Sequence, residues 1–161
     1  MPWAMESTRR GFPFYLSFVI FHLGVAAGIY LAVFNTLTPG VFLDPVGGRI
    51  MLAILGVSFL VSAYRVIRRF ARPVLRLISS PDDYFSVMTI TVWLFTGVLA
   101  QALLLGYLEG TNIMVVFLYT TSFFLIYVPF SKISHYLYYP IIRWYLGKTL
   151  GHRGSMPVHK S

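Results

Sequence analysis

Residues 112–135 read NIMVVFLYTTSFFLIYVPFSKISH, and this stretch decides the fold class. Its apolar run is close to the roughly 20 residues that an α-helix needs to cross a ~30 Å hydrocarbon core. Such a run predicts a helix, because an open strand would leave backbone groups unpaired in lipid. Pro129 lacks a backbone N–H and is expected to kink this helix. A single histidine, His135, follows the proline before a basic, aromatic exit.

Three further apolar runs precede this one, and the composition suits a membrane. The chain is 57% hydrophobic and 11% charged, whereas soluble domains carry about 25% charged residues. We predict an all-α integral membrane protein that forms a single membrane domain. It is a bundle of four transmembrane helices over residues 12–37, 50–69, 82–108 and 113–146, with a basic tail over residues 147–161.

The distribution of charge predicts the orientation. Of the 13 lysines and arginines, all but Arg49 precede the first helix, lie near and beyond the end of the second, or lie near and beyond the end of the fourth. The positive-inside rule therefore places both termini in the cytoplasm. We expect a multi-pass protein of the inner (cytoplasmic) membrane. The net charge of +8 is explained by topology and by anionic lipid, and no recognition motif suggests nucleic acid as a partner.

The four histidines differ in their surroundings. His152 and His159 lie in the polar tail, where solvated side chains are expected. His22 lies about ten residues into the first helix, or ~15 Å along it, and an ionisable group at that depth suggests a functional site. His135 is near the end of the fourth helix, which runs antiparallel to the first. The two imidazoles are therefore candidate axial ligands of a b-type haem, although structural hydrogen bonds across the bundle are an open alternative.

Two glycines follow His22 at a four-residue interval. Gly24 and Gly28 are expected to lie on nearly the same face as the turn of His22 and to remove bulk where a flat macrocycle could lie. The alternative is close packing of two helices on small residues.

The order and spacing of several short segments resemble a known family, the gamma subunit of respiratory nitrate reductase. Its relatives are the cytochrome b membrane subunits of heterodisulfide-reductase-like and sulfite-reduction-associated complexes. The resemblance extends from about Phe18 to Gly147. The segments that carry it are Phe21-His22-Leu23-Gly24-Val25, Thr38-Pro39, Arg68-Arg69 with Arg72-Pro73, Asp82-Asp83, and Pro129-Phe130-Ser131-Lys132 with His135.

The resemblance implies two stacked b haems with four axial histidines. His22 and His135 match the pair nearer the cytoplasm, whereas the second pair falls at Ala32 and Phe117, which cannot ligate iron. It therefore implies a one-haem member of the family, and the absence of the outer haem puts the family's quinol site beside it in doubt.

The resemblance also suggests roles for three cationic residues. Lys132 and Arg143 are candidate partners of the haem propionates, with anchoring at the cytoplasmic face as the alternative. Arg49 lies near a position where the family carries lysine close to the quinol. It is a candidate quinone contact, or alternatively an anchor that pairs with Asp44.

Two functions follow as hypotheses. The first is a non-catalytic cytochrome b subunit. It passes electrons between a membrane quinone (menaquinone or another type) and a cytoplasmic iron–sulfur subunit, and further membrane subunits are compatible with this role. The second is a haem-free membrane anchor of a larger complex. No cysteine is present, so this chain holds no thiolate-ligated cluster itself.

Overall fold

The computed structural model describes residues 11–38, 44–131 and 134–150, which form helices and no strands. The elements are α2 (Phe12–Leu37), α3 (Pro45–Ala71), α4 (Pro73–Ile78), α5 (Pro81–Leu104), α6 (Thr111–Tyr127), the 3₁₀ turn η3 (Val128–Phe130) and α7 (His135–Leu150). Four segments are long and apolar enough to cross a membrane: α2, α3, α5 and Asn112–Phe130. The prediction of an all-helical, multi-pass membrane protein is therefore confirmed.

Local chemistry explains where the helices begin and end. The carboxylate of Asp44 accepts a hydrogen bond of 2.8 Å from the backbone N–H of Gly47, so α3 begins at Pro45, earlier than the predicted residue 50. A capping box starts α5, in which the Ser80 N–H donates to Asp83 Oδ2 at 2.7 Å. Gly106, with φ of +75°, follows the last turn of α5, which explains why this helix stops at Leu104 and not at the predicted residue 108.

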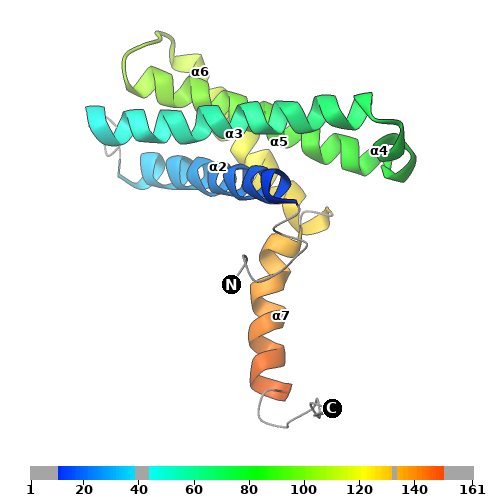
Figure 1. Ribbon diagram of the computed structural model, residues 1–161. Helices are drawn as coiled ribbons and strands as arrows, with labels where there is room; N and C mark the ends of the chain where they lie inside the picture. The colour runs from blue at the N-terminus through cyan, green and yellow to red at the C-terminus, as the bar shows by residue number, and fades with distance from the viewer. Residues whose placement is uncertain (1–10, 39–43, 132–133, 151–161) are drawn as a thin grey trace, which may run out of the picture.

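The last predicted helix differs most from expectation. We predicted one kinked helix over residues 113–146, but α6 ends at Tyr127 and the short turn η3 contains Pro129. A second helix, α7, starts at His135 and leaves the bundle at a steep angle to α2 and α3 (Figure 1). Proline cannot donate the backbone hydrogen bond that would continue the helix, so the chain can turn here.

Helices α3 and α5 form the centre of the bundle, with α2 packed on α3 and α6 on α5 (Figure 1). Trp93 of α5 is 3% exposed and lies at the middle of the core. Its indole Nε1–H donates to Thr121 Oγ1 of α6 at 2.8 Å, and a Cβ added to Gly28 of α2 would lie 2.7 Å from the indole ring. This one side chain therefore connects three helices.

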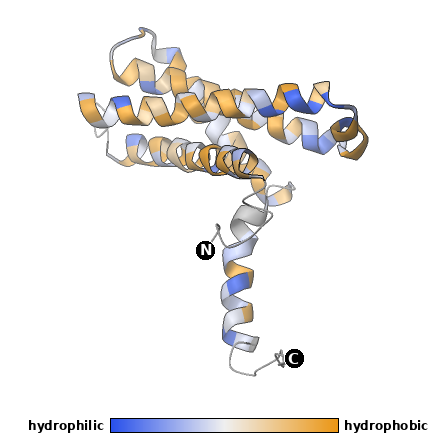
Figure 2. Cartoon of the chain, in the orientation of Figure 1, coloured by the Kyte–Doolittle hydropathy of each residue, from blue (hydrophilic) through white to orange (hydrophobic). Residues whose placement is uncertain are grey.

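Hydroxyl groups join neighbouring helices at several levels. Ser58 of α3 donates to the backbone carbonyl of Ile20 in α2 at 2.9 Å, and Ser62 of α3 pairs with Thr91 of α5 at 2.7 Å. Small and hydroxyl-bearing residues are typical of helix interfaces in lipid, because they allow close approach and supply hydrogen bonds. The four long helices are mainly apolar along their length (Figure 2). Many of their large hydrophobic side chains are exposed, as contact with lipid requires.

Candidate functional site

His22 has the surroundings of an oriented imidazole. Its Nδ1 lies 2.8 Å from the backbone carbonyl oxygen of Phe18, one turn earlier in α2. The ring centroid is 4.0 Å from that of Phe18 and 5.4 Å from that of Phe21. The side chain is half-buried, so it is held by its own helix and yet open on one side.

The hydrogen bond of His22 determines which nitrogen is available. A carbonyl oxygen only accepts, so Nδ1 must carry the proton. In the neutral ring, Nε2 then keeps its lone pair. Imidazoles that ligate metals commonly donate the other N–H to a backbone carbonyl or carboxylate in this way. His22 therefore fits the requirements of one axial ligand to a haem iron.

The partner imidazole cannot be placed in the same way. His135 is the first residue of α7, and its side chain lies outside the described atoms. Lys132, His152 and His159 lie outside the described residues.

The expectation for the two glycines requires a correction. Successive helical residues turn by ~100°, so His22 is about 160° from Gly24 and about 120° from Gly28 around the axis of α2. A Cβ added to Gly24 would overlap Cβ and Oγ of Ser58, and one added to Gly28 would meet the indole of Trp93. Both glycines therefore serve close helix packing, on a different face from His22.

The other described candidates are cations at opposite ends of the protein. Arg49 is exposed in the first turns of α3, and the Asp44 carboxylate caps that helix through Gly47 instead of forming an ion pair with Arg49. Arg143 is exposed on α7, with its guanidinium carbon 5.8 Å from the ring centroid of Tyr139. Neither side chain has a contact that argues for or against a cofactor.

The two positions that the resemblance assigns to a second pair of histidines lie in the packed core. Ala32 is 5% exposed and Phe117 is fully buried. The Phe117 ring stacks on Trp93, with centroids 6.4 Å apart and planes inclined by 17°. Protein side chains thus surround both positions.

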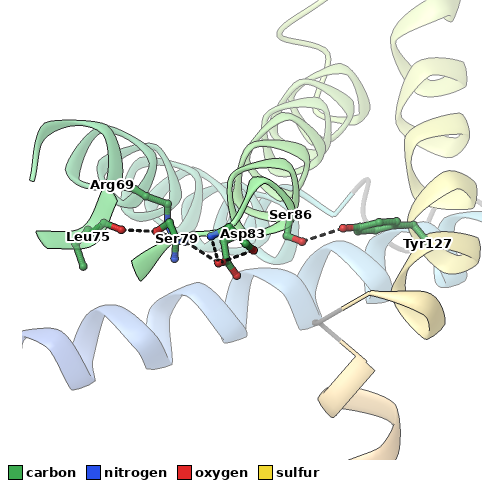
Figure 3. Close-up of polar contacts among 7 residues, drawn as sticks. Arg69, Leu75, Ser79, Asp83, Ser86 and Tyr127 are labelled. Atoms are coloured by element: carbon green, nitrogen blue, oxygen red, sulfur yellow. Dashed lines mark hydrogen bonds and ion pairs between the residues drawn. The ribbon is translucent and has the colours of Figure 1, made fainter. Parts of the chain in front are cut away.

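A polar network at the arginine-rich end of the bundle was not predicted as a unit. Arg69 of α3 donates to Ser79 Oγ at 2.9 Å and lies 3.9 Å from Asp83. Alongside it, the hydroxyl of Tyr127 in α6 is 2.9 Å from that of Ser86 (Figure 3). The Tyr127 hydroxyl also donates to Asp82 Oδ1 at 3.0 Å. The acidic pair was recognised as a helix start, but nothing in the sequence indicated that Tyr127 would reach it.

A shallow pocket of about 200 Å³ opens between α5 and α6, where Thr89, Trp93 and Thr120 contribute to its wall. Small-molecule sites usually measure about 300–1,000 Å³. This pocket is therefore too small for a porphyrin.

Comparison with known proteins adds no relative: no protein-family model matches the chain, and neither a curated protein nor a solved structure does.

Proposed function

We propose that the chain is a membrane electron-transfer subunit that carries one b-type haem between His22 and His135. The observation that carries this proposal is the hydrogen bond from His22 Nδ1 to the Phe18 carbonyl, because it leaves Nε2 available within a membrane span. In this proposal the free Nε2 lone pair would bind the haem iron.

The orientation proposed for the protein has both termini in the cytoplasm, in the inner membrane. The C-terminal part of α3 and the helix α4 carry five arginines between residues 65 and 76, and the polar network described above lies at the same end. The opposite end carries Arg49 alone among the cations. This asymmetry supports a cytoplasmic position for the arginine-rich end.

Each residue has a defined task in this proposal. A haem held by two imidazoles supplies one-electron redox chemistry without an open coordination position. His22 is oriented by its own helix, so it needs little reorganisation to ligate. Lys132 and Arg143 would neutralise the haem propionates at the cytoplasmic side. Arg49 would contact a quinone (menaquinone or another type) at the opposite side of the membrane. A cytoplasmic iron–sulfur subunit, and further membrane subunits, would exchange electrons with this chain.

A haem-free membrane anchor is the second candidate. It is favoured by the packing at Gly24 and Gly28. Ser58 and Trp93 fill the space beside these two glycines, so no gap for a planar macrocycle is left there. In that case the Nδ1 hydrogen bond of His22 has only a structural role.

A reduced-minus-oxidised absorbance spectrum of the purified chain separates the two candidates. We expect b-type bands that disappear in His22→Ala and in His135→Ala but remain in the tail variant His152→Ala. Bands that stay at full intensity in both single variants would refute the axial assignment, and a protein that never binds haem in its native membrane would be the anchor.

A further inference from the structure

Two arginines at the seam between α2 and α3 share an unusual environment. Arg65 and Arg68 lie one turn apart on α3, and both are half-buried. The guanidinium carbon of Arg65 is 4.7 Å from the ring centroid of Phe21, and that of Arg68 is 5.7 Å from the centroid of Phe14. Phe14 and Phe21 are two turns apart on α2, so each guanidinium rests on its own ring.

These ring contacts orient the guanidinium groups through their flat faces and do not occupy their hydrogen-bond donors. Stacking uses the flat face of the guanidinium, whereas its five N–H donors point outward in the plane. Arg68 Nε is buried and has no hydrogen-bond partner among the described residues. Arg69 pairs with Asp83, whereas within the described part of the chain neither Arg65 nor Arg68 forms an ion pair with a carboxylate.

The position of the pair along α3 matches the headgroup layer. Arg65 follows the start of α3 at Pro45 by 20 residues, or ~30 Å, which is the thickness of the hydrocarbon core. Tyr64 and Ile67 flank the pair on α3 and are 56% and 65% exposed. Apolar surface suited to acyl chains therefore borders the two charges.

We propose that Arg65 and Arg68 form a binding site for the phosphate of an anionic phospholipid. Planar guanidinium forks pair well with phosphate oxygens, and two adjacent positive charges without a carboxylate favour a lipid with net negative charge. A zwitterionic lipid fits less well, because its own amine would be repelled. The proposal does not rest on a bound haem.

The test uses the full chain, purified and reconstituted in nanodiscs with equal amounts of phosphatidylglycerol and phosphatidylcholine. The lipid that stays bound after detergent washing is then measured by mass spectrometry. We expect the wild type to retain phosphatidylglycerol preferentially, and R65Q/R68Q to retain at least about tenfold less, since the charge-assisted hydrogen bonds from the two guanidinium forks to the phosphate would be lost. The matched control is R72Q/R76Q, which removes two exposed arginines just beyond the seam and should retain it within about twofold.

Several results would overturn the proposal. Equal retention of the two lipids by the wild type is one such result. Another is a loss of phosphatidylglycerol in R72Q/R76Q as large as that in R65Q/R68Q, because this loss would indicate general charge attraction. Unchanged lipid retention in R65Q/R68Q with loss of haem absorbance would assign the pair to a haem carboxylate instead. If R65Q/R68Q does not fold, R65K/R68K keeps the charge without the fork and should retain several-fold less lipid; retention equal to wild type would contradict the site.

Discussion

The contact between α2 and α3 permits a sharp test of the bundle. Gly24 is buried, and a Cβ placed there would overlap Cβ and Oγ of Ser58, whereas the Ser58 Cα would be 3.6 Å away. Gly24→Ala therefore forces the two helices apart. Overpacking of this kind costs about 1–3 kcal/mol, and the better helix propensity of alanine offsets up to about 1 kcal/mol. We expect a net loss of about 1–2 kcal/mol in the free energy of unfolding.

The chain offers a matched control and a rescue. A Cβ added to Gly56 of α3 meets nothing within 4 Å, so Gly56→Ala should be neutral or stabilise by up to about 1 kcal/mol. In the double variant Gly24→Ala/Ser58→Gly the overlapping atoms are gone. It loses only the Ser58 hydrogen bond to Ile20, worth about 0.6 kcal/mol in a membrane, and the small advantage in helix propensity that serine has over glycine at position 58.

The assay is reversible unfolding in bicelles, analysed as a double-mutant cycle. We expect a coupling energy of at least about 1 kcal/mol between positions 24 and 58. If Gly24→Ala were as stable as Gly56→Ala, or if Ser58→Gly gave no rescue, the packing of α2 on α3 at Gly24 would be refuted.

Three other predictions address the core, the polar network and the orientation. Trp93→Phe removes the indole N–H bond to Thr121 and part of a buried ring, so it should lower the free energy of unfolding by about 1–3 kcal/mol, measured as above; an unchanged value would contradict the central position of this side chain. Tyr127→Phe removes two hydroxyl contacts and should cost about 0.5–1.5 kcal/mol, whereas a gain in stability would argue against the network. Since the chain has no cysteine, Tyr107→Cys should react with an impermeant maleimide from outside intact spheroplasts and Leu77→Cys only after lysis; the reverse pattern would invert the proposed topology.

The spans could be predicted from the sequence because lipid imposes a simple rule of length and apolarity. Residues 12–37 were predicted with the bounds that α2 has. The ends of α3 and α5 were less accurate, since they depend on caps at Asp44 and on the left-handed Gly106. These are local contacts that a hydropathy pattern does not contain.

The separation of α6 from α7 could be anticipated only in part. Pro129 indicated a kink, but the size of the turn depends on what the chain beyond it contacts. The short helix α4 was missed because Arg72-Pro73 was taken for a simple exit from the second span, although proline is well suited to the first turn of a new helix.

The faces of the helices were the least predictable feature of the candidate site. Gly24 and Gly28 were assigned to the face of His22, but their angular positions place them against α3 and α5. The pairs Ser62 with Thr91 and Trp93 with Thr121 depend on the register between helices, which a single sequence does not specify. The bond from His22 to Phe18 is local to one helix, yet it also requires a particular side-chain rotamer.

The most direct test of the account is the electron paramagnetic resonance spectrum of the oxidised protein, purified with its native membrane lipids, together with the haem content per chain. Two imidazoles on one ferric iron predict a single low-spin species at one haem per chain, and His22→Ala should convert any haem that remains to a high-spin species. A wild-type protein with no haem signal, or with a high-spin signal alone, would contradict bis-histidine ligation by His22 and His135.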